Sequence, residues 1–369
     1  MVQELFLKMK ILVIMKRFGA NKDMVGENFG RQIRLFENLA KKHEIDFFCP
    51  DYVKKESKAI TRDGIRYIIM PVSLLSVFSF YGSLKKLIKK ERYDVIIAST
   101  DSLIGIIGHK LSKKFGIPLV YDLQDNFESY DTYRIPFVKY FDRKVLKKAD
   151  AVITVSDSLK KYISKIRSGP IYTIQNGTDL NLFKITDKTT ARKKLKLPLK
   201  AKIIVFIGHV EKLKGGQILI DAFDIIREGY PDTYLLLSGK IGSDININKK
   251  NVIYRKFPKR EEVVLGINAA DVAVLPNPVN SFTKYCFPYK LLEYMACNVP
   301  IVATDVGDVS ELLGKYEGSL CKPDDAFDLA KKLIAKLQFD GRVNYRKGLG
   351  KFDWRILSRK LDEILNDLK

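Results

Sequence analysis

The sequence predicts an α/β protein made of two doubly wound parallel-sheet domains that face each other across a central cleft. Three observations lead to this prediction. The chain has 369 residues, enough for two domains of about 100–200 residues each. Short apolar runs alternate with amphipathic helical stretches, which is the rhythm of βαβ units. A polar segment rich in Thr, Lys and Asp at 177–200 interrupts this rhythm once and is the expected linker.

The first half begins with the apolar run KILVIM at Lys10–Met15, then a glycine-containing loop and a helical pattern at Phe29–Lys42. Further strand patterns follow, with basic helices between them, at Glu44–Cys49, Arg66–Met70, Val95–Ala98, Leu119–Tyr121 and Ala151–Val155. Unbroken apolar runs of this length are typical of parallel strands covered on both faces. This half therefore predicts one parallel sheet.

The second half repeats the alternation after residue 200. Strand patterns lie at Lys202–Ile207, Thr233–Leu237, Val252–Tyr254, Val272–Leu275 and Ile301–Ala303. Helical patterns lie at Gln217–Glu228, Glu261–Ala270 and Tyr289–Cys297. Ligands of such sheets bind outside the carboxyl ends of the strands, so we expect the functional residues in the loops that follow the strands.

Charge is the unusual property of the composition. The chain carries 65 Lys and Arg against 43 Asp and Glu, a net charge of +22, and the excess is spread over both halves. A field of this size attracts nucleic acid, an anionic membrane surface or phosphorylated substrates. No nucleic-acid-binding motif accompanies the charge, so we expect no nucleic-acid partner. An apolar fraction of 46% excludes a disordered or collagen-like chain.

Cysteine and histidine usage argues against a disulfide scaffold and a metal centre. The four cysteines form no CxxC pair, and the three histidines are scattered (His43, His109 and His209). The first residues, MVQELFLKMK, lack the apolar core of a signal peptide. The longest uncharged run, Tyr67–Leu84, contains proline, glycine and serines, which disfavours a membrane-spanning helix. A reducing cytoplasmic location fits these features.

Five blocks occur in a fixed order along the chain. They are Ala149–Phe183, Val205–Gly239 (VFIGHVEKLKGG at its start), Asn251–Pro276, Pro288–Asp308 (PYKLLEYMACNVPIVATDVGD) and Phe352–Leu365. In this order and spacing they resemble the retaining glycosyltransferases of family 4, which have the GT-B fold of two Rossmann-like domains. The resemblance covers nearly the whole chain, from Lys10 to Leu365. It implies a nucleotide diphosphate sugar as donor. Because no DxD pair stands at a strand end, we expect lysines to replace a divalent cation at the diphosphate, and we expect no other cofactor.

The resemblance also implies the domain division. The helix containing Trp354 resembles the last helix of the family, which crosses back to pack on the first domain. We therefore expect residues 1–178 and 350–369 to form the N-terminal, acceptor-side domain. Residues 179–349 are expected to form the C-terminal, nucleotide-sugar-binding domain.

The segment from Gly208 to Gly215 follows a strand and precedes a helix, where N–H groups and the helix dipole favour phosphate. Breaking a glycosyl–diphosphate bond places negative charge on the phosphate oxygens, so cations there stabilise the transition state. The resemblance assigns Lys214 to the diphosphate, as a catalytic and donor-binding residue, and Gly208 to the donor-binding turn. His209 stands where the family usually has Arg, and a neutral His donates one hydrogen bond without a fork. The alternative for Lys214 is a solvated lysine at the helix start.

Glu293, in KLLEYMA, is assigned by the resemblance to the ribose diol of the donor, since a carboxylate accepts two hydrogen bonds from a diol. Many family members have a second Glu eight residues earlier, where this chain has Tyr285. The local pattern instead resembles the Pro-x-Lys subgroup, with Pro288 and Lys290. Lys290 contacts the diphosphate or the sugar, or else is solvated. An exposed helix glutamate is the alternative for Glu293.

In the first half, YDLQDNFE at 121–128 follows a strand, and Asp125 is its only candidate acid or base. Asp125 is catalytic, contacts the sugar, or caps a loop. Gly26, in MVGENFG, allows the backbone to approach the donor phosphates closely, or is an ordinary loop glycine.

The segment 73–92 combines an apolar stripe at helical spacing with a basic cluster, which suits an anionic membrane interface. The stripe is Leu74, Phe78, Tyr81, Leu84 and Ile88, and the basic residues include Lys85, Lys86, Lys89 and Lys90. Residues 137–148 repeat the theme. The alternative is a core-facing helix with a solvated basic face. The membrane-interface interpretation favours peripheral membrane association and a polyprenyl-phosphate-type acceptor.

The sequence therefore predicts a metal-independent, hexosyltransferase-type enzyme that moves a sugar, with retention, to a membrane-associated lipid-linked or glycan acceptor. Two alternatives remain. One is a glycosyltransferase with a soluble acceptor. The other is a catalytically inactive GT-B protein that binds a nucleotide, which the replacements at Tyr285 and His209 would fit.

Overall fold

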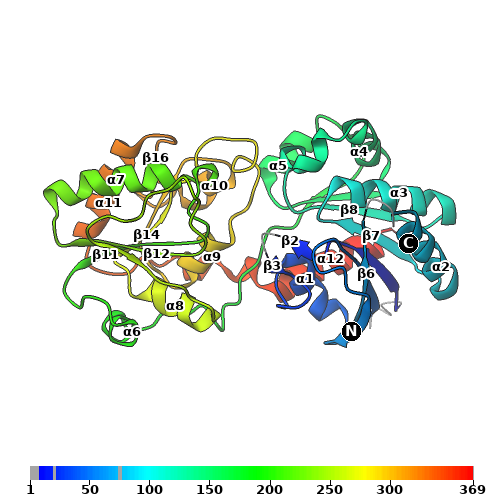
Figure 1. Cartoon of the computed structure of the whole chain (residues 1–369), viewed down its shortest axis with the longest axis horizontal. Coiled ribbons are helices and arrows are strands. Elements are labelled where there is room, and N and C mark those ends of the chain that lie inside the picture. The colour runs from blue at the N-terminus through cyan, green and yellow to red at the C-terminus, as the bar shows by residue number, and fades with distance from the viewer. Residues whose placement is uncertain (1–7, 20–21, 74–76, 369) are drawn as a thin grey trace, which may run out of the picture. The chain divides into compact units, whose positions relative to one another are not determined.

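The structure is a computed structural model that describes residues 8–19, 22–73 and 77–368. The chain forms two compact units (Figure 1). The N-terminal unit comprises the chain up to Gln175 together with the segment from Trp354 onward, and the C-terminal unit is Asn176–Asp353. The sequence placed these junctions at 178/179 and 349/350, within four residues of the observed positions.

The N-terminal unit is built on an eight-stranded sheet of order β10-β9-β8-β7-β1-β4-β6-β5. Its strands are β1 Lys10–Ile14, β4 Glu44–Asp51, β5 Lys58–Arg62, β6 Ile65–Pro71, β7 Val95–Ser99, β8 Leu119–Leu123, β9 Ala151–Thr154 and β10 Ile171–Thr173. A short hairpin pairs β2 Phe18–Gly19 with β3 Lys22–Asp23. The helices are α1 Arg31–Leu39, α2 Val77–Glu91, α3 Ser102–Phe115, α4 Val138–Lys148, α5 Asp157–Ile163 and α12 Trp354–Asn366.

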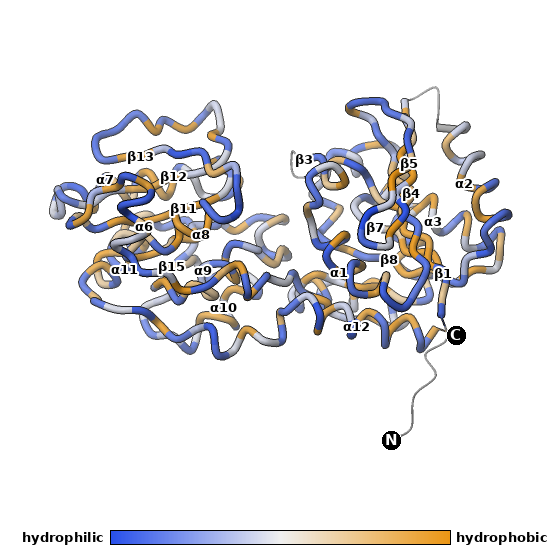
Figure 2. Tube along the Cα trace, turned by 90° about the horizontal axis from the view of Figure 1, so that it is seen from below, coloured by the Kyte–Doolittle hydropathy of each residue, from blue (hydrophilic) through white to orange (hydrophobic). Residues whose placement is uncertain are grey.

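The C-terminal unit has a six-stranded parallel sheet of order β13-β12-β11-β14-β15-β16. The strands are β11 Lys202–Ile207, β12 Thr233–Ser238, β13 Val252–Tyr254, β14 Val272–Leu275, β15 Ile301–Thr304 and β16 Leu320–Cys321. The helices are α6 Lys188–Leu195, α7 Gly216–Gly229, α8 Arg260–Asn268, α9 Tyr289–Ala296, α10 Asp308–Leu313 and α11 Ala326–Gln338. Figure 2 shows that hydrophobic residues concentrate along the strands of each unit, as expected for sheets covered on both faces.

The C-terminal helix belongs to the first unit. Helix α12 packs beside α1, and its Leu357, Leu361 and Ile364 join the core of the N-terminal sheet. A polar contact fixes the helix further: His43 Nδ1 accepts the Met9 N–H at 3.1 Å, and its Nε2 lies 2.8 Å from Asp362 Oδ1. The crossing helix that the resemblance implied is therefore present on the expected unit.

The predicted fold class, two Rossmann-like α/β domains with parallel sheets, is confirmed. Strand β5 differs, because it runs antiparallel to β6 at the edge of the sheet and carries few apolar residues. The linker expected at 177–200 was wrong in part, since it contains α6. Asp187 caps that helix by accepting the Thr190 N–H at 2.7 Å, and the buried Arg192 pairs with Asp271 at 2.7 Å.

Candidate functional site

The carboxyl end of β11 makes a tight turn at Gly208, whose φ of +145° favours glycine. Its N–H donates to the Ser238 carbonyl at 2.7 Å, and the neighbouring Gly239 also has a positive φ of +121°. A Cβ on Gly239 would lie 2.2 Å from the Gly208 carbonyl oxygen. The two strand ends are therefore pressed together in a way that leaves space only for glycine.

Lys290 fills the space directly in front of this turn. A Cβ on Gly208 would lie 2.5 Å from Lys290 Nζ, and the ammonium sits 4.0 Å from the centre of the buried Phe206 ring. Helix α9, which carries Lys290, is fixed to the end of β11, because the Ile207 N–H donates to the Tyr294 hydroxyl at 2.9 Å. The predicted residues Gly208 and Lys290 are thus in contact.

The electrostatic setting of Lys290 is unfavourable for its charge. Burial, and secondly the charge of Lys214, lower the pKa of Lys290 to about 7. The nearby carboxylates have other partners: Glu211 Oε1 lies 2.9 Å from Lys214 Nζ, and Glu293 Oε1 lies 3.0 Å from Arg260. A desolvated amine of this kind gains from any anion that reaches it.

Lys214 ends a 3₁₀ turn, Lys212–Lys214, just before α7. Gly215 follows with φ +78°, and a Cβ there would lie 1.7 Å from the Pro276 carbonyl oxygen. Glycine is therefore required at the junction that presents Lys214. The side chain of Lys214 is half-buried and is paired with Glu211, so a solvated lysine does not describe it.

His209 follows Gly208 in the same turn and is half-buried. Burial, followed by the charge of Lys214, lowers the pKa of His209 below its usual value. The lowered pKa favours the neutral imidazole, which can donate a single hydrogen bond.

Glu293 projects from the same helix as Lys290, one turn further on. Its partner is Arg260, at the start of α8, whose guanidinium lies 4.9 Å from the centre of the Phe183 ring. Arg260 and Phe183 could not be predicted as site residues, because an arginine in a charged helix start and a phenylalanine in a polar segment carry no distinctive sequence signal. Glu293 is mostly buried, with 15% of its side chain exposed, so it is not a solvated helix glutamate.

In the N-terminal unit, Asp125 follows β8 and accepts the Tyr130 hydroxyl at 2.7 Å. Close by, Lys16 after β1 pairs with Asp101 after β7 at 2.9 Å, and Lys16 Nζ lies 5.6 Å from the Tyr130 ring centre. The carboxyl ends of three adjacent strands thus gather a lysine and two aspartates. The sequence analysis missed Lys16 and Asp101, although their positions immediately after strand patterns were a usable signal.

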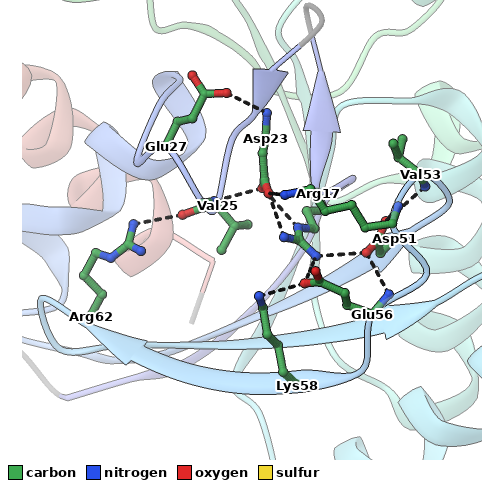
Figure 3. A network of polar contacts seen from close by, with 11 residues as sticks. Arg17, Asp23, Val25, Glu27, Asp51, Val53, Glu56, Lys58 and Arg62 are labelled. Carbon is green, nitrogen blue, oxygen red and sulfur yellow. Dashed lines mark hydrogen bonds and ion pairs between the residues drawn. The ribbon is translucent and has the colours of Figure 1, made fainter. Parts of the chain in front are cut away.

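The loop of Gly26 is held by a buried network centred on Arg17 (Figure 3). Arg17 Nη2 lies 2.6 Å from Asp23 Oδ2, and its Nη1 lies 2.9 Å from Asp51 Oδ2. Asp23 Oδ1 in turn accepts the Gly26 N–H at 2.9 Å, and a Cβ on Gly26 would lie 2.7 Å from Asp23 Oδ2. The glycine is needed for this packing, and its N–H is committed to Asp23. The approach of the loop to a donor phosphate stays a prediction.

The structure places part of the predicted membrane stripe on α2 in the core, while membrane binding itself stays a prediction. Leu84 and Ile88 are buried in the core, together with Phe80, so this apolar face packs inside the unit. Leu74 and the side chain of Phe78 lie outside the described residues. Tyr81 is half-buried, with Lys85 Nζ 5.1 Å from its ring centre, while Lys86, Lys89 and Lys90 are exposed. The reason is that core-facing and membrane-facing helices share the same period.

Across the described ranges, no group of three His, Cys, Asp or Glu side chains is arranged to hold a metal ion. All four cysteines are buried thiols outside any disulfide. Within the same ranges, no helix has both the length and the apolar character needed to cross a bilayer.

Comparison with known families covers most of the chain. The sequence profile described as "Glycosyltransferase Family 4" matches residues 33–182, and the profile "Glycosyl transferases group 1" matches residues 187–350. A Bacillus subtilis (strain 168) protein named "Putative teichuronic acid biosynthesis glycosyltransferase TuaC" is 29% identical over 226 residues, which is 60% of this chain and 56% of that protein. The match thus spans about half the length of the first such relatives.

Solved structures share the whole fold. Sucrose-phosphate synthase from Thermosynechococcus elongatus superposes with a TM-score of 0.76 and 19% identity, covering 98% of this chain and 99% of the other. Anabaena Alr3699/HepE in complex with UDP superposes with a TM-score of 0.74 and 18% identity, covering 98% and 100%. At these identities the likeness establishes the two-domain architecture.

Proposed function

This chain belongs to family 4 of the glycosyltransferases, and from that premise we propose that it transfers a sugar, with retention, from a nucleotide diphosphate sugar to a lipid-linked or glycan acceptor. The observation that carries the proposal is the contact of Lys290 with the Gly208 turn, with Lys214 and Glu293 on adjacent elements. Two lysines at a glycine turn, with a carboxylate on the adjoining helix, are groups that suit a nucleotide diphosphate.

The donor phosphates bind at the Gly208 turn in this proposal. The two carboxylates near Lys290, Glu211 and Glu293, form ion pairs with Lys214 and Arg260, so a phosphate supplies the charge that these ion pairs direct elsewhere. Lys214 exchanges Glu211 for a phosphate oxygen. As the glycosidic bond breaks, charge grows on the leaving diphosphate, and both lysines stabilise the transition state more than the ground state. With two lysines in this role, the reaction needs no divalent cation.

Glu293 accepts the hydroxyls of the donor ribose, while Arg260 keeps the carboxylate ionised and correctly placed. The acceptor hydroxyl forms its new bond to the anomeric carbon on the face that the diphosphate leaves, and its proton passes to the leaving phosphate oxygen. Asp125, held by the Tyr130 hydroxyl, contacts the sugar or the acceptor hydroxyl.

The first donor to test is UDP-glucose, since similar folds have been solved with UDP and UDP-glucose. The assay measures UDP release from UDP-glucose, and from a panel of other nucleotide sugars, with polyprenyl phosphate, glycan or no acceptor. We expect donor-dependent release that Lys214→Ala reduces about a hundredfold or more, the scale of one lost transition-state contact. Tight nucleotide binding without release from any donor would instead support the inactive alternative.

The acceptor class separates the two remaining forms of the proposal. The exposed basic surface of the N-terminal unit favours an acceptor at a lipid surface over one free in solution. Transfer to polyprenyl phosphate in vesicles, compared with transfer to soluble oligosaccharides, decides between the two.

A further inference from the structure

Four large apolar side chains are exposed together where the chain enters α4. Ile135, Phe137, Tyr140 and Phe141 have exposed fractions of 48%, 76%, 66% and 41%. The last three are spaced i, i+3 and i+4, so they share one side of the helix, and the Tyr140 and Phe141 rings lie 5.2 Å apart. We call these four residues the aromatic patch. Contiguous exposed apolar surface of this kind marks an interaction site.

The aromatic patch is not the core-facing side of α4. The opposite side of α4 already packs inside the unit through Val138, Val145 and Leu146. The buried Asp142 fixes the helix further, because it accepts hydrogen bonds from the hydroxyls of Tyr121 and Tyr133. Helix α4 lies beside α3 (Figure 1) and is held there with its aromatic side outward.

The backbone adds a second observation at the start of the helix. Phe137 has φ +66° and ψ −10°, a left-handed conformation that costs about 1–2 kcal/mol for a residue with a Cβ. Asn or Gly would suit this exposed position better in water. The chain instead presents a phenyl ring there, which is favourable only if the ring is buried against something else.

Charge identifies the occupant. Lys139, Lys144, Lys147 and Lys148 are all exposed on the same short helix, and Lys144, Lys147 and Lys148 continue the aromatic side toward its C-terminal end. A protein partner's surface is mixed in charge, whereas an anionic bilayer offers apolar depth under a layer of negative charge. Aromatic rings at headgroup level with lysines around them match that arrangement.

We propose that the aromatic patch and the four lysines of α4 form a surface that docks on an anionic lipid bilayer. The inference deepens the proposed function, on which it rests for the lipid-linked acceptor. Of the two segments that the sequence singled out, it selects 137–148 on α4, whose apolar side chains are exposed, over 73–92 on α2, whose Leu84 and Ile88 are buried. The N-terminal unit would then meet a lipid-linked acceptor at the plane where that acceptor resides.

The test is flotation of the full chain with phosphatidylcholine vesicles, with and without phosphatidylglycerol, in the absence of any donor. The wild-type protein is expected to float with the anionic vesicles only. The double variant Phe137→Ser, Tyr140→Ser is expected to lower the partition coefficient about tenfold or more, because two rings are withdrawn from the interface. Lys144→Gln with Lys147→Gln is expected to lower it roughly fivefold per lysine at low salt, since each contributes about 1 kcal/mol.

Matched variants control for general effects of exposure and charge. Phe327→Ser removes a 70% exposed ring from α11 of the C-terminal unit and should leave flotation unchanged. Lys86→Gln with Lys89→Gln tests the basic face of α2. Flotation that depends on α2 and not on α4 overturns the proposal, as does negligible binding of the wild-type protein to both vesicle types. Self-association that Phe137→Ser abolishes, without vesicle binding, assigns the patch to a second copy of the chain and also overturns it.

A fluorescent readout covers the case in which the double variant folds poorly. Phe137→Trp should show a blue-shifted emission on adding anionic vesicles, and Phe327→Trp should not. No transfer activity enters either measurement. Vesicle binding without UDP release would therefore refute the proposed function alone, and UDP release without vesicle binding would refute the docking surface alone.

Discussion

Replacing Lys290 by Met tests whether this buried lysine serves to bind phosphate rather than to stabilise the fold. Its pKa falls from 10.5 to about 7 because the charge is buried and lies near Lys214. At about 1.36 kcal/mol per pKa unit, the shift corresponds to at most about 5 kcal/mol of strain in the free protein. Water still reaches the half-buried side chain, so we expect the buried charge to destabilise the wild-type protein by roughly 1–2 kcal/mol. Lys290→Met should therefore raise the free energy of unfolding at pH 6.

The sign of the pH dependence follows from linkage. Between pH 7 and 10.5 the unfolded lysine holds a proton that the folded one has released, so wild-type stability from this residue rises with pH. The advantage of Lys290→Met is therefore largest below pH 7 and shrinks through that window. Urea unfolding at pH 6 and pH 9 measures both values.

Donor binding should change in the opposite direction. A charge-assisted hydrogen bond to phosphate contributes about 1.5–3 kcal/mol, so the Kd for UDP-glucose should rise about tenfold to a hundredfold in Lys290→Met. Wild-type affinity should also fall as the pH rises above 7, because the free amine must take up a proton to bind, and the variant should lose this slope. Lys284→Met, an exposed lysine stacked on Tyr285 in the preceding loop, is the matched control. A variant that is less stable at pH 6, or that binds UDP-glucose as tightly as wild type, would refute the reasoning.

Three other substitutions give separate expectations. Glu293→Gln should raise the KM for UDP-glucose about tenfold and should leave the KM for the matching 2′-deoxyribose donor unchanged. An equal rise in KM with both donors would show that Glu293 does not contact the ribose. Gly215→Ala, whose Cβ would meet the Pro276 carbonyl, should cost about 3 kcal/mol or more by thermal unfolding, while Gly229→Ala, with nothing within 4 Å, should be tolerated. Burial raises the pKa of Asp142 to about 6, so the folded protein binds more protons than the unfolded chain between pH 4 and 6. The contribution of Asp142 to the free energy of unfolding therefore falls as the pH rises through that window. Asp142→Asn should flatten this dependence in urea titrations and be about 1 kcal/mol more stable at pH 7, and unchanged pH slopes would contradict it.

The sequence predicted most of the sheet because buried parallel strands leave continuous apolar runs, such as KIIVFI in β11. It missed β5 because an edge strand with one exposed face reads as polar. It missed α6 because α6 has few apolar positions, although Asp187 gives a cap signal.

The candidate site divides in the same way. Gly208, Lys214, Lys290 and Glu293 belong to local motifs, so the chain order alone could point to them. Arg260 pairs with Glu293 and Lys16 pairs with Asp101, and each partner lies far away in sequence. No local pattern reveals these pairings, although Lys16 and Asp101 each follow a strand pattern. The sequence could not choose between the two candidate membrane segments, 73–92 and 137–148, because helical periodicity does not distinguish a stripe that faces the core from one that faces outward. Only burial separates α2 from α4.

The central claim is that two lysines at the Gly208 turn make this chain a nucleotide-sugar-dependent transferase. The most direct measurement is the rate of nucleotide release from a panel of nucleotide sugars by wild-type protein, Lys214→Ala and the Lys284→Met control. We expect release from at least one donor, with a rate that is about a hundredfold or more lower in Lys214→Ala and unchanged in Lys284→Met. Release that Lys214→Ala does not slow, or no release from any donor, would contradict it.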